Sequence, residues 1–136
     1  MSASSIAGGS YAGRIIALLN GWPAVRTGPA DCGLGVGVHT RAGQILHLHD
    51  ESYATLRLTG PVIERLHEAL THAGRFFIAP DDDWIGMRLE TPSDVTLLVT
   101  LVSLAIKANL GAPPPAPALL AGACGAGRRP PIPVAG

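Results

Sequence analysis

Two histidines separated by one residue, His47 and His49, are the residues of this chain best suited to proton transfer. They lie in the segment 33–50, which reads GLGVGVHTRAGQILHLHD. In a β-strand, side chains two positions apart point to the same face at about 6.5–7 Å, so both imidazoles would face one substrate. One could act as a base while the other donates a hydrogen bond, and we predict both as catalytic residues. The alternative is that they are half-buried histidines without a catalytic role.

The same imidazoles could also ligate a metal ion, for which a third ligand is required. His39 could supply it from the neighbouring strand, and Asp50 or Asp81 could supply a carboxylate. No spacing other than His-x-His supports such a set, so we predict no bound metal. The glycines of 33–37 lie in an expected strand, whereas glycines that cradle phosphate open a helix. We therefore predict no cofactor.

The segment 35–49 predicts a β-hairpin whose turn is the three-residue loop 41–43, closed by a glycine in the left-handed conformation. The expected pairs are Val36 with Leu48, Val38 with Leu46 and Thr40 with Gln44. One face would then be aliphatic. The other would set glycines against histidines and leave room for a shallow pocket, with Gly35, Gly37, His39, Ile45, His47 and His49 on it. A four-residue loop would instead turn the histidines toward the valines.

Two further segments supply candidate walls for this pocket. Phe76 and Phe77 would form an apolar wall, although packing in the core is the commoner role of such residues. Trp84 follows three aspartates at 81–83, which suit either a binding loop or a solvated turn. The predicted substrate-binding residues are Gly35, Gly37, His39, Phe76, Phe77, Asp81 and Trp84.

The elements that position these residues follow from apolar spacing and end signals. Helices are expected over 10–20, 60–73 and 92–110, the last with Thr91 as N-cap, Pro92 at its first position and Asp94 at its third. Besides the hairpin, strands are expected over 53–58 and 84–90, with shorter extended pieces at 22–25 and 75–78 and a turn at Gly28 and Pro29. This order predicts an α+β fold, a two-layer sandwich whose antiparallel sheet of about four or five strands carries three helices packed mainly on one face.

Composition indicates one domain over 10–110, a flexible N-terminus at 1–9 and a disordered tail rich in Pro, Gly and Ala at 111–136. Hydrophobic residues make up 47% of the 136 residues and charged residues 15%, with ten basic and ten acidic side chains. No basic cluster interleaved with aromatic residues is present, which disfavours nucleic acid as a partner. The apolar run 95–110 is shorter than the roughly 20 residues of a membrane span, so we expect a buried helix and no membrane.

The two cysteines, Cys32 and Cys124, have no partner at metal-ligand spacing. A disulfide bond is the alternative, but no pattern in the sequence supports one, and we expect both cysteines to be reduced. The first residues lack the basic region of a signal peptide. The expected location is the cytoplasm.

Several motifs together resemble the luciferase-domain family, which contains fungal luciferase and many small bacterial proteins. They are GWPAV after the first helix, QILHLHD in the hairpin, ERLHEALTHAGR in the second helix, IAPDDDW before a strand and TPSDV before the last helix. The resemblance covers roughly residues 14–108. It carries over onto His47, His49, Pro80, Asp81 and Trp84.

This chain departs from the family pattern at its other polar positions. The family has an Arg-Phe-Gly-Gly-x-Glu-Phe stretch before the His-x-His strand and a His-His pair before the Pro-Asp-x-x-Trp turn. The corresponding positions here read CGLGVGV at 32–38 and Phe76-Phe77, so Gly37 replaces the glutamate and two phenylalanines replace the histidines.

The resemblance implies oxygen-dependent oxidation of a phenolic molecule as a family activity. We predict a luciferase-domain-like protein that binds a small aromatic or hydrophobic ligand on the histidine-lined sheet face, and its status as an enzyme is left open. The alternative is a non-catalytic protein–protein interaction module or a homodimer.

Overall fold

The computed structural model describes residues 9–79 and 82–110. The expected tail at 111–136, most of the flexible N-terminus at 1–9, and the site residues Pro80 and Asp81 lie outside these described residues. The described residues form an α+β fold with one antiparallel sheet, which confirms the predicted class.

The sheet has six strands in the order β1-β2-β3-β4-β6-β5, one strand more than the upper prediction. Their bounds are β1 Arg26–Pro29, β2 Val36–Thr40, β3 Gly43–Leu48, β4 Tyr53–Arg57, β5 Phe76–Ile78 and β6 Trp84–Arg88. The additional strand is β1, which contains Gly28 and Pro29, so the turn predicted there is wrong. Proline is tolerated because β1 is an edge strand, where a missing N–H donor costs no sheet hydrogen bond.

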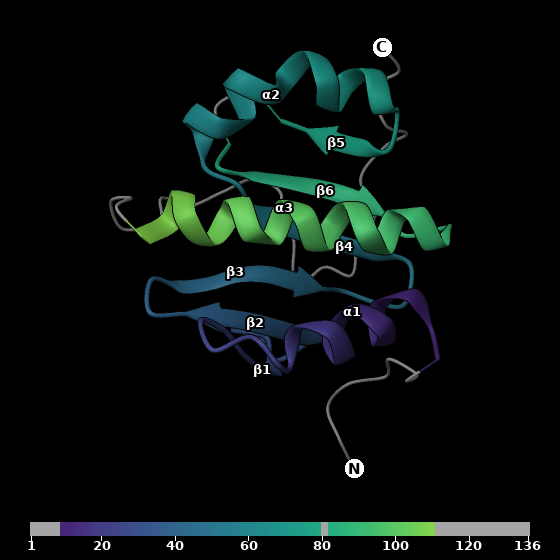
Figure 1. The fold of residues 1–136 in the computed structure, drawn as a ribbon, viewed down its shortest axis with the longest axis vertical. Coiled ribbons are helices and arrows are strands. Elements are labelled where there is room, and N and C mark those ends of the chain that lie inside the picture. Colours follow the sequence, from purple (N-terminus) through teal and green to yellow (C-terminus); the bar gives the residue numbers. More distant parts are fainter. Residues whose placement is uncertain (1–8, 80–81, 111–136) are drawn as a thin grey trace.

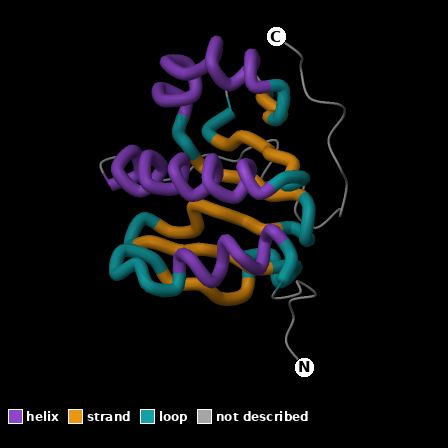
Figure 2. Tube along the Cα trace, turned by 45° about the vertical axis from the view of Figure 1, so that its right-hand side comes forward, coloured by secondary structure: helices purple, strands orange, loops and turns teal. Residues whose placement is uncertain are grey.

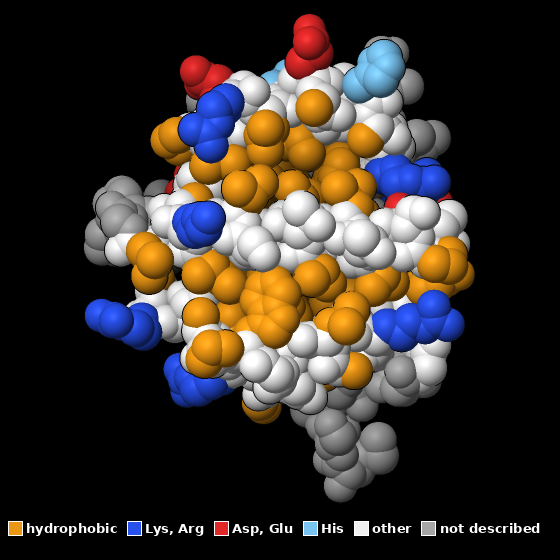
Figure 3. Space-filling view, viewed as in Figure 1, with side chains coloured by type: hydrophobic (Ala, Val, Ile, Leu, Met, Phe, Trp, Pro, Cys, Tyr) orange, Lys and Arg blue, Asp and Glu red, His pale blue; other side chains and the backbone are white. Residues whose placement is uncertain are grey.

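Three helices, α1 Tyr11–Leu19, α2 Gly60–Ala73 and α3 Pro92–Leu110, form the second layer on one face of the sheet (Figures 1 and 2). The aliphatic face of the sheet and the inner faces of the helices share one core, which includes Ile15, Leu46, Leu56 and Leu98. Helix α3 is long and apolar enough to span a membrane by length and composition. In this fold it packs on β3, β4 and α1, as expected of a buried helix. Apolar side chains flank it in two bands on the helix side of the molecule (Figure 3).

The start of α3 and the end of α2 follow the sequence signals. Thr91 Oγ1 accepts a hydrogen bond from the Asp94 backbone N–H at 3.3 Å, and an Asp94 carboxylate oxygen accepts one from the Thr91 N–H at 2.9 Å. This reciprocal pair is the predicted capping box. Gly74 ends α2 with φ 70°, a left-handed conformation that favours glycine.

The central hairpin differs from its prediction at the turn. Val36 pairs with Leu48 and Val38 with Leu46 as expected, but Thr40 pairs with Gly43 and His39 with Gln44, so the register skips Ile45. The loop therefore has two residues and is followed by a β-bulge. Because the bulge places Ile45 in the hydrophobic core beside Leu46, the prediction that Ile45 shares the histidine face is wrong.

Candidate functional site

The sheet face opposite the shared core carries both predicted catalytic histidines. Register aligns one residue from each of five strands in a row across this face, namely Gly37, His47, Thr55, Gly86 and Phe77. Side chains alternate along a strand, so His49, Tyr53 and Trp84 project from the same face. We call this surface the histidine face.

The imidazoles of His47 and His49 are stacked on one another. Their ring centroids are 3.8 Å apart and their planes differ by 25°. His47 Nε2 lies 2.6 Å from the Leu34 carbonyl oxygen, and His49 Nε2 lies 2.9 Å from Thr55 Oγ1. Each ring is therefore held by its own hydrogen-bond partner as well as by its neighbour.

His47 is the more buried histidine, with 2% of its surface exposed. Burial lowers its pKa below 6.5, and the opposing effects of the Leu34 carbonyl and the Asp31 charge are smaller. A carbonyl oxygen only accepts hydrogen bonds, so Nε2 must carry the proton. In the neutral ring favoured by burial, Nδ1 is then the basic nitrogen.

Aromatic rings continue this surface beyond the histidines. The Tyr53 ring lies 5.1 Å from His49 and meets Phe77 edge-on at 5.7 Å between centroids. Aromatic pairs with centroids 4.5–7 Å apart contribute roughly 0.5–1.5 kcal/mol beyond their buried area. The sequence places Tyr53 and Thr55 on one side of their strand by alternation, but it does not show that this strand pairs with the histidine strand. Both site residues were therefore missed.

The glycines of the histidine face do not leave the pocket that was predicted. A Cβ atom at Gly37 would lie 2.5 Å from Gln44 Oε1 and 2.9 Å from both His39 Nε2 and Ala30 Cα. At Gly35, which has φ +76°, a Cβ would overlap the Leu48 carbonyl oxygen. Neighbouring side chains and backbone thus fill the space over these glycines, and the prediction of a glycine floor with room above it is wrong. Gly35 also precedes β2, since the strand begins at Val36.

The predicted walls of the site divide between the two faces. Phe77 lies on the histidine face, whereas Phe76 belongs to the hydrophobic core, because consecutive residues of β5 point in opposite directions. The placement of Phe76 in the site is therefore wrong. Trp84 is buried on the histidine face two residues from Gly86 along β6.

His39 is turned away from the stacked pair. Its Nε2 lies 3.2 Å from the Pro29 carbonyl oxygen, and its Nδ1 lies 3.8 Å from an Asp31 carboxylate oxygen. Within residues 9–79 and 82–110, no group of three or more His, Cys, Asp or Glu side chains could hold a metal ion. His39 is thus placed to bridge β1, β2 and the loop that follows β1.

Cys32 does not carry a free thiol, because its sulfur is in a disulfide bond. The expectation that it is reduced is wrong.

Comparison with known proteins gives one match. A family model described as Luciferase domain matches residues 42–105, the segment from the hairpin turn to the last part of α3. No curated protein and no solved structure matches the chain.

Proposed function

We propose that this chain is a member of the luciferase-domain family, whose model matches residues 42–105, and that it binds a small phenolic or hydrophobic molecule at the histidine face. The observation that carries the proposal is the stacked pair of His47 and His49, continued by the Tyr53 ring. Three adjacent rings offer a planar ligand both stacking and hydrogen-bonding partners.

The two histidines have different roles in this proposal. His47 is held by the Leu34 carbonyl and buried, so it orients its neighbour. His49 is half-buried and is the ring that a ligand reaches. A phenolic hydroxyl would donate its hydrogen bond to the imidazole of His49, the ordinary arrangement for a general base.

Proton removal from a phenol is also the step that oxidation by dioxygen would use, since a phenolate gives up an electron more readily than a phenol. This is the activity that the family resemblance implies. The binding proposal stands without it, and oxygen uptake measured with a bound phenol would establish it separately.

Fluorescence titration with 1-naphthol, a small planar phenol, tests the proposal. His49→Ala should weaken binding about tenfold, the effect of losing one good hydrogen bond and a stacking partner. His72→Ala, at an exposed position on α2, is the matched control and should bind like the unaltered protein. Equal affinities of the two variants would contradict the proposal.

A second candidate function is an interaction or dimerisation module that uses the helix layer. Leu18 on α1 is 51% exposed and Leu110 at the end of α3 is 66% exposed, and apolar bands flank α3 (Figure 3). Sedimentation velocity should then show a fraction of dimer that increases with protein concentration. A strict monomer at all concentrations would contradict this candidate.

A further inference from the structure

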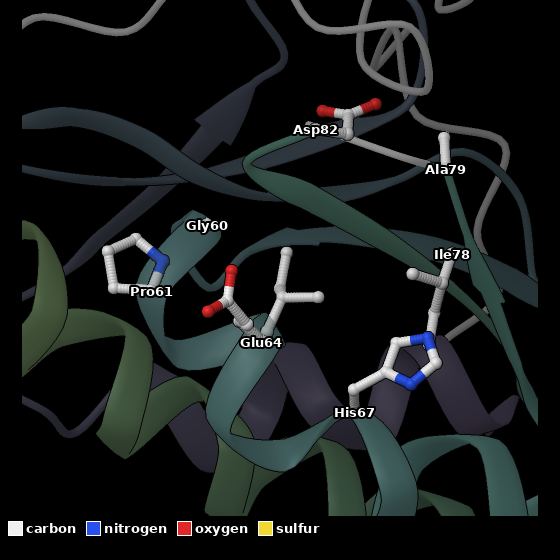
Figure 4. A pocket seen from close by; sticks show the side chains of 8 residues that line it. Gly60, Pro61, Glu64, His67, Ile78, Ala79 and Asp82 are labelled. Atoms are coloured by element: carbon white, nitrogen blue, oxygen red, sulfur yellow. The ribbon is translucent and has the colours of Figure 1, made fainter.

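A cavity of about 650 Å³ lies between α2 and β5 and shares no lining residue with the histidine face (Figure 4). Volumes of roughly 300–1,000 Å³ are typical of sites for small molecules. Its lining consists of Gly60, Pro61, Ile63, Glu64, His67, Ile78, Ala79 and Asp82.

The walls of this cavity are largely aliphatic. Pro61 and Ile63 come from the first turn of α2, and Ile78 and Ala79 come from the end of β5 and the residue after it. Together they offer a short alkyl or cyclic group a surface on which to lose its contact with water.

The polar groups at the cavity are mainly acidic. Glu64 and His67 are one helical turn apart on α2, so they share one side of the helix, and both are exposed. Asp82, across the cavity in Figure 4, is only 4% exposed and accepts a hydrogen bond from the Trp84 N–H at 3.0 Å. Among the described residues that line the cavity there is no lysine or arginine.

A third carboxylate lies close to the same end of the cavity. Asp83 Oδ1 accepts a hydrogen bond from the Gly60 N–H at 2.7 Å, and Asp83 Oδ2 lies 3.8 Å from Arg57 Nη2. Arg57 offsets the charge of Asp83, and Asp82 is buried, so Glu64 is the exposed carboxylate of the lining. Glu64 is the carboxylate that a ligand entering from solvent meets.

We propose that this cavity binds a small organic cation, an ammonium group on an aliphatic body. The ammonium group donates a charge-assisted hydrogen bond to the Glu64 carboxylate, and the aliphatic body packs on Ile63 and Ile78. An organic cation fits better than a metal ion, because the described part of the chain holds no cluster of three metal-ligating side chains and much of the lining is apolar.

Three probes with the same six-carbon body and different charge test this assignment: hexylammonium, hexanol and hexanoate. Each is titrated into the full chain and followed by ¹H–¹⁵N correlation spectra. Hexylammonium should shift the amide signals of Glu64, His67, Ile78 and Ala79, hexanol should bind more weakly, and hexanoate should bind least. Glu64→Gln should weaken hexylammonium binding about threefold, the effect expected of one exposed ion pair.

Glu68→Gln is the matched control, one turn further along α2 and outside the cavity lining. It should bind hexylammonium like the unaltered protein. Equal binding of the three probes, equal effects of the two variants, or no shifts around the cavity would each overturn the proposal. Since the cavity and the histidine face share no residue, the test is independent of 1-naphthol binding.

Discussion

The imidazole rings of His47 and His49 stack with only 3.8 Å between their centroids. Side chains two positions apart on a regular strand are about 6.5–7 Å apart, so the two rings lean toward one another. Two protonated imidazoles at this separation would repel each other, and burial already lowers the pKa of His47. The pair therefore favours the state in which His47 is neutral.

Protein stability should fall as the pH is lowered from about 7.5 to about 5.5, because of His47. Its pKa in the folded state lies below 6.5, the ordinary value, so the unfolded chain takes up the proton first. The contribution of neutral His47 to stability is fully present at pH values above its pKa in the unfolded chain. This contribution is lost as the pH falls through that pKa toward the lower pKa of the folded state, at no more than about 1.4 kcal/mol per pH unit.

Urea unfolding of the unaltered protein and of His47→Gln across this range measures the effect. The glutamine amide can still donate to the Leu34 carbonyl but does not titrate, so the variant should show a shallower pH dependence. Identical pH dependences, or an NMR titration of His47 at or above pH 6.5, would contradict the assignment.

Thr55 should position His49 through its hydroxyl group. Thr55 is fully buried, and its Oγ1 lies 2.9 Å from His49 Nε2. Thr55→Val removes the hydroxyl at nearly constant volume and should weaken 1-naphthol binding about tenfold, since a lost buried hydrogen bond costs roughly 1 kcal/mol or more. Thr55→Ser keeps the hydroxyl and should restore binding to within about twofold.

The NMR signals of the His49 ring provide a second measurement for the Thr55 variants. They should move in Thr55→Val and stay close to their original positions in Thr55→Ser. If serine and valine weaken binding equally, the hydroxyl group does not position the ring.

The parts of the fold that were predictable are those with local causes. The capping box of Thr91 and Asp94 and the glycine after α2 act within a few residues of themselves, so their spacing in the sequence is sufficient. The bulge at Ile45 was not predictable in this way. It depends on the burial of two consecutive side chains, Ile45 and Leu46, in a core that distant helices complete.

Only the part of the site on the histidine strand was predictable from the sequence. His47 and His49 share a face, as their spacing requires, but the contribution of Tyr53 and Thr55 depends on which strand pairs with β3. The prediction of open space above Gly37 was wrong for a similar reason. Gln44 and His39 are long enough to fold over a glycine, and their direction is decided by hydrogen bonds that alternation along a strand does not show.

Gly86 should be required for the position of the Tyr53 ring. A Cβ atom at Gly86 would overlap the Tyr53 hydroxyl oxygen and would lie 3.0 Å from Cε1 of the same ring. Gly86→Ala should therefore destabilise the protein by about 1–3 kcal/mol, measured by urea unfolding. Gly28→Ala, on β1 with no atom within 4 Å of the added methyl group, is the control and should cost less than about 1 kcal/mol.

A second background makes the Gly86 prediction more specific. In Tyr53→Phe the hydroxyl group is absent, so the added methyl group meets only ring carbons, those at position 53 and Phe77 Cδ2 at 3.1 Å. Gly86→Ala should therefore cost less there than in the unaltered protein. Equal costs in both backgrounds would show that the Tyr53 hydroxyl does not limit this position.

Asn109 should hold the end of α3 to the sheet through Arg57, which is 2% exposed. The Arg57 guanidinium donates a hydrogen bond to Asn109 Oδ1, and Asn109 Nδ2 donates to the Arg57 backbone carbonyl at 2.8 Å. Asn109→Ala leaves a buried charge and a buried carbonyl with fewer partners, so it should lower the free energy of unfolding by about 2–4 kcal/mol.

Asn20→Ala is the control for this prediction. Asn20 accepts one exposed hydrogen bond from Thr27, so its replacement should cost less than about 1 kcal/mol. Asn109→Asp keeps an acceptor for the guanidinium and should fall between the two. Urea unfolding in which Asn109→Ala costs no more than Asn20→Ala would mean that the buried pair does not fasten the helix.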